Sequence, residues 1–295
     1  MTESSGAQRI CAALSSAGAD AFPVVLPYEE LFARDHWSQF SRSPWHFQLS
    51  YNLFDQRHWR RELYQAVDQD WFILPEFYTL DERRRFTIVT DGDKIYRRDL
   101  IEGTTRAITR DDIGGLGDRI ISTGILPSDS PVTEDAIDLC IFDLDPETTS
   151  GLDLLADDPA DSRGDLAAAL LKFNRGRRSP YRQLATPLWS CYELFGFERL
   201  MTLIATEPGL IQYAAERFLE LLIADAERCA SDGVEIVWLE ETLGDLIAPD
   251  AHLTLGLEYT TRLIDAVNQL EMKSVLYYTG NPRDRIDCLA ACGPD

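Results

Sequence analysis

The alternation of helices and buried strands in the last ninety or so residues is the feature that most constrains the fold. The strand at 234–239 runs directly into Glu240 and Glu241, and the strand at 274–277 runs into a polar loop at 278–281. Alternating helices and strands with polar residues at the carboxyl ends of the strands are typical of parallel α/β enzymes. The sequence therefore predicts an α/β fold whose functional site lies at these two loops.

Charge and composition limit the partners of the chain. The 295 residues include 50 acidic and 28 basic side chains, which gives a net charge of −22. Nucleic acid and anionic membrane surfaces require a positive footprint, so we expect neither as a partner. The sequence has no apolar run of about 18 residues and begins without the pattern of a secretory signal. Six scattered cysteines do not suggest a disulfide framework, and we expect a single cytoplasmic domain over residues 1–295.

Local patterns predict an antiparallel insertion in the first half of the chain. Apolar strands at 86–90 and 94–97 flank an Asp-Gly-Asp turn, which is a strong hairpin signal because glycine accepts a positive φ. With a third strand at 104–109, they predict a small β-meander at 84–110. Helical spacing also predicts a helix at 57–67.

Other apolar runs predict further strands at 22–26, 70–74, 137–144 and 184–189. The first of these lies between two prolines, and we interpret it as the opening strand of a barrel.

The C-terminal helices are predicted from their start signals and apolar stripes. Pro208 marks the start of one helix, which we expect to end near Gly233. Asp250 is predicted to cap the next helix, whose apolar stripe includes Leu253 and Leu257.

Several short motifs in this order resemble the uroporphyrinogen decarboxylase superfamily. They are LFGFERLM at 194–201, EPGL at 207–210, ASDGVEIVW at 230–238, APD at 248–250, GN at 280–281 and CLAACGPD at 288–295. VLPY at 25–28 and RDHW at 34–37 resemble methyltransferase-like members of that superfamily. The resemblance covers mainly residues 185–295 and rests on several motifs rather than on one signature.

The resemblance implies a (β/α)8 TIM barrel with the β-meander as an insertion. The barrel of the superfamily continues beyond the motif that ends at Asp295, so we expect a barrel truncated at its C-terminus. The resemblance further implies a small-molecule substrate, a corrinoid carried by a partner protein, and a homodimer.

Departures from the superfamily pattern narrow the function. Zinc-dependent methyltransferases of this superfamily bind the metal through a His-x-Cys pair, and the matching residues here are Tyr277 and Thr279. Neither is a good zinc ligand at neutral pH, so we expect no zinc. The Arg-Gln-Ala-Gly-Arg loop of the decarboxylases is absent from the sequence.

The leading hypothesis is therefore a methyltransferase-like enzyme that lacks the zinc ligands. Two alternatives remain open. One is uroporphyrinogen decarboxylation in porphyrin biosynthesis, and the other is a catalytically lapsed barrel that binds a ligand or a partner protein.

Five residues at the ends of the last two strands are candidates for the site. Glu240, Glu241 and Tyr277 are predicted to be catalytic, with a carboxylate acting as general acid or base. Thr279 and Asn281 are predicted to bind substrate. Each has a structural alternative, since a carboxylate can cap a turn or pair with arginine, a tyrosine can pack in the core, and an asparagine before proline is a common turn residue.

An aromatic-rich segment near the N-terminus supplies three further candidates. Trp37, Trp45 and His46 are predicted to form an aromatic part of the substrate-binding site. The spacing of the histidines in this segment matches no compact metal-binding motif.

Overall fold

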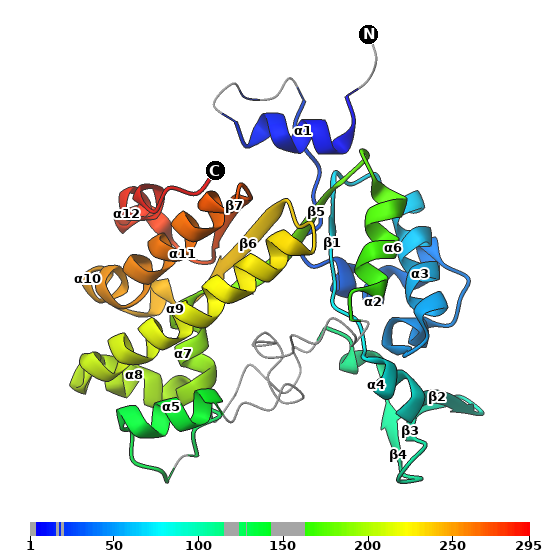
Figure 1. Cartoon of the computed structure of the whole chain (residues 1–295), viewed down its shortest axis with the longest axis horizontal. Helices are drawn as coiled ribbons and strands as arrows, with labels where there is room; N and C mark the ends of the chain where they lie inside the picture. The colour runs from blue at the N-terminus through cyan, green and yellow to red at the C-terminus, as the bar shows by residue number, and fades with distance from the viewer. Residues whose placement is uncertain (1–3, 16–17, 19–20, 115–123, 128, 143–162) are drawn as a thin grey trace. The chain divides into compact units, whose positions relative to one another are not determined.

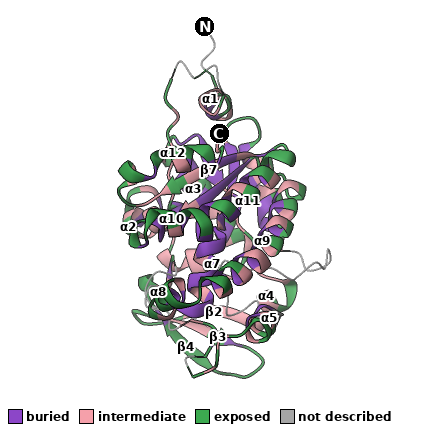
Figure 2. Ribbon diagram, turned by 90° about the vertical axis from the view of Figure 1, so that its left-hand side faces the viewer, coloured by how far each residue is buried: buried purple, intermediate pink, exposed green. Residues whose placement is uncertain are grey.

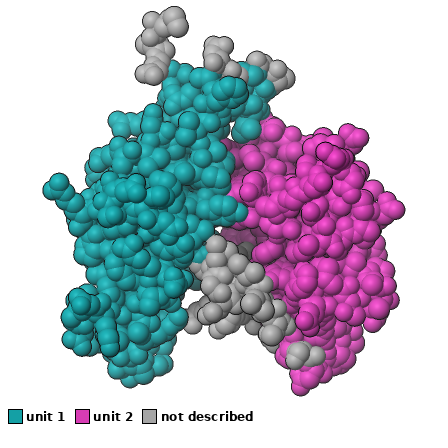
Figure 3. Space-filling view, turned by 180° about the vertical axis from the view of Figure 1, so that it is seen from behind, with its two compact units in different colours: residues 1–119, 158–181 teal, residues 120–157, 182–295 magenta. Residues whose placement is uncertain are grey.

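A computed structural model of the chain has two compact units. It describes residues 4–15, 18, 21–114, 124–127, 129–142 and 163–295. Unit 1 comprises residues 1–119 and 158–181, and unit 2 comprises residues 120–157 and 182–295 (Figure 3). The expectation of a single domain over residues 1–295 stays a prediction.

In both units, more of the described residues lie in helices than in strands (Figure 1). The described helices of unit 1 are α1 (Gly6–Ala13), α2 (Glu29–Phe40), α3 (Leu53–Ala66), α4 (Leu80–Arg85) and α6 (Asp165–Asn174), with the 3-10 turns η1 (Trp45–Leu49) and η2 (Arg110–Asp112). Those of unit 2 are α5 (Glu134–Phe142), α7 (Pro187–Phe195), α8 (Phe197–Thr206), α9 (Pro208–Ser231), α10 (Pro249–His252), α11 (Glu258–Gln269) and α12 (Ile286–Ala291), with the 3-10 turns η3 (Gly244–Leu246) and η5 (Pro282–Asp284) and the π-helix η4 (Leu253–Leu257).

The main sheet confirms the predicted α/β class. Its strands are β1 (Trp71–Ile73), β5 (Ser179–Ala185), β6 (Ile236–Glu241) and β7 (Lys273–Tyr278), in the order β1-β5-β6-β7. β1 pairs with β5 in parallel, and so does β6 with β7. A closed barrel of eight strands stays a prediction, because the described sheet has four.

The predicted β-meander is confirmed. Strands β2 (Phe86–Asp91), β3 (Lys94–Asp99) and β4 (Thr105–Ile108) form a separate antiparallel sheet. The β2–β3 turn contains Gly92 at φ 58°, a left-handed conformation that costs glycine little.

Three of the predicted strands are wrong, in whole or in part. Residues 22–26 form no strand. Val24 instead contacts the residue before β1: its amide donates to the Asp70 carboxylate, and its carbonyl accepts from the Asp70 amide. The run at 137–144 is helical as far as Phe142, within α5, and its last two residues lie outside the described chain.

The run at 184–189 is divided between a strand and a helix. β5 ends at Ala185, and the Thr186 hydroxyl then accepts from the Trp189 amide as the N-cap of α7. Pro187 occupies the first position of the helix, where its missing N–H costs nothing. The strand therefore lies earlier in the chain than its apolar pattern predicts.

Strand β6 is deeply buried in unit 2. Its residues Ile236–Leu239 are all at most 1% exposed. Burial on both faces is typical of a central parallel strand, and it explains the nearly continuous apolar sequence. Helices α9 and α11 run beside β6 and β7 (Figure 1), and buried positions gather along strands and inward-facing helix stripes (Figure 2).

Unit 1 contains a buried carboxyl group at the start of α2. Glu29 is 1% exposed and accepts hydrogen bonds from the Tyr64 hydroxyl at 2.9 Å and from the Gln69 amide at 2.8 Å. Burial raises the pKa of Glu29 from 4.5 to about 7, although the Arg60 charge and both hydrogen bonds oppose the increase. Glu29 thus connects α2 to α3 and to the residues before β1.

We expect this group to make the stability of unit 1 depend on pH. Because the pKa of Glu29 is raised in the folded state, its protonated form stabilises the fold, and that stability is lost as pH rises from about 5 to about 8. Over this pH range, the ionisation of Glu29 should lower the free energy of unfolding by about 3 kcal/mol. Urea unfolding of Glu29→Gln, followed by tryptophan fluorescence, should show a much weaker pH dependence.

The control is Glu227→Gln, because Glu227 is exposed on α9. This variant should keep the pH dependence of the wild type. A Glu29→Gln profile parallel to that of the wild type would contradict the prediction.

Candidate functional site

The carboxyl ends of β6 and β7 present two different sets of side chains on the two faces of the sheet. The register pairs Glu240 with Tyr277 and Glu241 with Tyr278. Since side chains alternate along a strand, the first pair lies on one face and the second pair on the other. The two adjacent glutamates of the sequence therefore belong to separate environments.

The first face, here called the open face, comprises Gln183, Trp238, Glu240 and Tyr277. The Glu240 carboxylate accepts a hydrogen bond from the Gln183 side-chain amide at 2.8 Å. The Tyr277 ring lies 5.4 Å from the Trp238 ring, centroid to centroid, with the planes at 72°. Trp238 is buried, whereas Tyr277 is 39% exposed. The open face thus carries an exposed aromatic ring, fixed edge-on by a buried one, beside a carboxylate.

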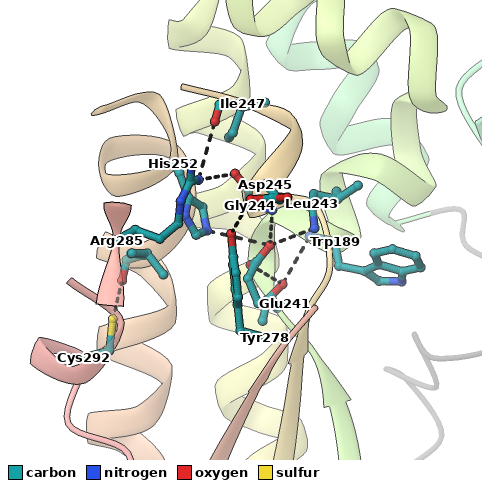
Figure 4. A network of polar contacts seen from close by, with 12 residues as sticks. Trp189, Glu241, Leu243, Gly244, Asp245, Ile247, His252, Tyr278, Arg285 and Cys292 are labelled. Atoms are coloured by element: carbon teal, nitrogen blue, oxygen red, sulfur yellow. Dashed lines mark hydrogen bonds and ion pairs between the residues drawn. The ribbon is translucent and has the colours of Figure 1, made fainter. Parts of the chain in front are cut away.

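The second face, here called the covered face, is organised around Glu241 (Figure 4). This carboxylate is 1% exposed. One oxygen accepts from the backbone N–H groups of Leu243 and Gly244, both at 3.1 Å, and the other accepts from the Thr186 hydroxyl at 3.1 Å. Three donors compensate the loss of hydration of a buried carboxylate. Glu241 therefore joins the end of β6 to the start of α7 and to η3.

His252 lies beside Glu241 and is the main residue that sequence reasoning missed. Its side chain is fully buried, and its Nε2 lies 3.8 Å from a Glu241 oxygen (Figure 4). Neither ring nitrogen has a hydrogen-bond partner among the described residues. An imidazole in such a place is unusual, because a buried polar group normally finds a partner.

Two glycines leave room for this imidazole. A Cβ atom on Gly244 would lie 2.5–2.9 Å from three His252 ring atoms, and one on Gly256 would lie 3.0 Å from the His252 Cδ2. The Tyr278 ring lies 6.2 Å from the imidazole.

The π-helix η4 explains why the sequence pattern concealed His252. The predicted apolar stripe places Leu253 inward, but Leu253 is 45% exposed and His252 is fully buried. A π-turn adds a residue to the helix repeat and so shifts which side chains face the core. Asp250 lies in the first turn of α10 instead of capping it, because the N-cap is Ala248. The one available signal is that His252 alone among the four histidines lies outside the aromatic-rich segment.

Arg285 closes the covered face from the C-terminal side. It is 5% exposed, and its guanidinium donates to the carbonyl of Gly244 and pairs with Asp284 at 3.0 Å. The Asp284 carboxylate raises the pKa of Arg285, which therefore remains charged. The Tyr278 hydroxyl lies 3.5 Å from the Asp245 carboxylate, and burial raises the Tyr278 pKa.

Thr279 and Asn281 have local structural contacts. The Thr279 amide donates to the Glu241 carbonyl at 3.1 Å, which extends the pairing of β6 and β7. The Asn281 side chain accepts from the Arg283 amide and caps η5. Their predicted part in substrate binding stays a prediction.

The three aromatic candidates lie in unit 1. Trp37 is 3% exposed, packs 5.9 Å from the Trp59 ring and donates to a backbone carbonyl, all of which are contacts of a core residue. Trp45 and His46 are half-buried neighbours with ring centroids 6.1 Å apart. Burial lowers the pKa of His46. A substrate-binding role for these residues stays a prediction.

No group of three or more His, Cys, Asp or Glu side chains in the described part of the chain is arranged to hold a metal ion. Among the same residues, no helix combines the length and apolar character needed to cross a membrane.

Comparisons with known proteins identify a related fold. No family model matches the sequence, and no curated protein matches it. Among solved structures, the chain is similar to a methyltransferase from Methanosarcina mazei, with a TM-score of 0.60 and 14% sequence identity. The match covers 99% of this chain and 74% of that one. At this identity the likeness shows a shared fold.

The close approach of Gly244 to His252 can be tested by substitution. We expect Gly244→Ala to lower the free energy of unfolding by about 1–3 kcal/mol, because the added methyl group overlaps the imidazole. In a His252→Ala background the same substitution should cost much less, since the overlapping ring is gone. Chemical denaturation of the four proteins measures both effects.

Gly209→Ala is the matched control. Gly209 lies in the first turn of α9, and a Cβ atom there meets nothing within 4 Å. It should change stability by less than about 1 kcal/mol, in the stabilising direction. Equal costs for the two alanines in the wild type would mean that the imidazole does not lie against Gly244.

Proposed function

We propose that the chain is a methyltransferase-like enzyme of the uroporphyrinogen decarboxylase superfamily, with its site on the open face at the ends of β5, β6 and β7. The observation that carries the proposal is the likeness in fold to a protein named as a methyltransferase, over nearly the whole of this chain. The carboxyl ends of parallel strands are also where such folds bind substrate. A corrinoid enters this proposal as a co-substrate carried by a partner protein.

The residues at the motif position do not fit zinc. In the resemblance described above, Tyr277 and Thr279 match the His and Cys ligands of the superfamily motif. A tyrosine hydroxyl and a threonine hydroxyl are poor zinc ligands at neutral pH. No step of the proposed reaction is therefore assigned to a resident metal ion.

The residues of the open face can bind and orient a substrate. Gln183 donates to Glu240 and so fixes the direction of its carboxylate. Tyr277 is 39% exposed, and contact with the Trp238 ring limits the rotation of its own ring. Positioning of a substrate by such groups contributes to rate by holding the reacting atoms in place.

Two other functions are less well supported. Decarboxylation of a polycarboxylate would require a cationic site, whereas the Glu240 carboxylate on the open face repels anions. Ligand binding without turnover is favoured by one observation, the full occupation of Glu241 by structural hydrogen bonds. A carboxylate that accepts hydrogen bonds from three donors in the folded protein acts mainly to stabilise the scaffold.

The proposal predicts methyl transfer that depends on the open face. With methylcobalamin as the methyl carrier and a panel of thiol acceptors, the wild-type chain should convert the carrier, as followed by its absorbance. Glu240→Gln and Tyr277→Leu should lower kcat/KM by about tenfold or more, the usual effect of losing a charge-assisted contact or a packed ring.

Glu235→Gln is the control, since Glu235 lies exposed just before β6 at the opposite end of that strand. It should leave the rate unchanged. Absence of transfer with every acceptor, from a folded chain that still binds a ligand on the open face, would favour binding without turnover.

Metal removal supplies an independent test. Because Tyr277 and Thr279 replace the metal ligands, we expect exhaustive treatment with a chelator to leave the methyl-transfer rate unchanged. Metal analysis of the purified chain should find no stoichiometric zinc. A rate that falls with chelation and returns with zinc would contradict the donor-set argument.

A further inference from the structure

The open face combines two features that suit a cationic ligand. Tyr277 is 39% exposed, and its ring lies at 72° to the ring of the buried Trp238. In the parallel register, Glu240 is the direct neighbour of Tyr277 on the adjacent strand and on the same face. Neighbouring strands lie about 5 Å apart, so the carboxylate and the ring border a common volume.

An aromatic ring with a nearby carboxylate favours cations over neutral molecules. The face of an aromatic ring carries partial negative charge and attracts a cation within about 6 Å of its centre. The Glu240 carboxylate adds a full negative charge beside it. The net charge of −22 gives the whole chain a potential that concentrates cations and repels anions.

The aromatic part of the open face distinguishes between kinds of cation. A primary ammonium ion binds best through direct N–H donation, whereas a quaternary ammonium or sulfonium ion has no N–H or S–H to donate. Such a methylated ion interacts through its diffuse charge, for which an aromatic face and a nearby counter-charge are sufficient.

We propose that the open face binds a small methylated onium ion, quaternary ammonium or sulfonium, against the Tyr277 ring with Glu240 as its counter-charge. This inference names a substrate class for the site proposed above and rests on that location. Methyl groups on a positively charged nitrogen or sulfur leave a neutral molecule behind when they are transferred, which agrees with a methyltransferase-like role. Binding itself requires no turnover.

Choline and its neutral isostere test the proposal directly. The isostere, 3,3-dimethylbutan-1-ol, has the same shape as choline but a carbon atom in place of the charged nitrogen. Isothermal titration of the full chain should give binding of choline and of tetramethylammonium, with the isostere weaker by about tenfold. Affinity for choline should fall as salt is raised, because the attraction is electrostatic. Equal binding of choline and the isostere would overturn the proposal.

Substitutions on the open face locate the ion. Tyr277→Leu should weaken choline binding about tenfold, whereas Tyr277→Phe should keep it, because phenylalanine retains the ring. Glu240→Gln should also weaken binding, and Glu235→Gln at the other end of β6 should not. If Tyr277→Leu does not fold, NMR spectra of the wild type provide the test. Choline should shift the signals of the Tyr277 ring protons. Unshifted ring protons would overturn the proposal.

The binding and transfer experiments separate the two proposals. Choline binding without methyl transfer from any donor would support the onium site and count against the methyltransferase-like function. Methyl transfer to or from neutral compounds without choline binding would support that function and overturn the onium site.

Discussion

The candidate site depends on the hydrogen bonds that the buried Glu241 carboxylate accepts. A carboxylate that is 1% exposed would destabilise the fold by several kcal/mol if it lacked donors. Its three donors come from two separate parts of the scaffold: the Thr186 hydroxyl before α7, and the amides of Leu243 and Gly244 after β6. The loops that follow β5 and β6 therefore adopt their positions together.

Elements that depend on neighbouring residues in the sequence could be predicted, and elements that depend on distant ones could not. The β-meander follows from its Asp-Gly-Asp turn, and β6 follows from its continuous apolar run. The predicted strand at 184–189 is wrong because an apolar run does not distinguish a strand from a buried helix start, and Thr186 with Pro187 provides the helix start. Glu240 and Glu241 lie on opposite faces only if both belong to the strand. The sequence does not show where the strand ends, so this separation becomes clear only from the observed register.

His252 shows a second limit of pattern reasoning. A heptad-like stripe assumes an unbroken α-helix, and the π-helix η4 breaks that assumption between α10 and α11. The result is that Leu253 faces solvent and His252 faces Glu241. The space for the ring comes from Gly244 and Gly256, which are separated from each other by twelve positions in the chain. No spacing rule connects a histidine to glycines on both sides of it, so only the three-dimensional packing reveals the arrangement.

The division between the two faces explains why fold and chemistry can differ in a chain of this kind. Contacts of Glu241, His252 and Arg285 hold the loops from the covered face. The exposed Tyr277 on the open face contributes little to those contacts. Residues on the open face can therefore change without loss of the scaffold. For this reason, likeness in fold does not determine the reaction, and the chemistry has to be inferred from the side chains that the open face presents.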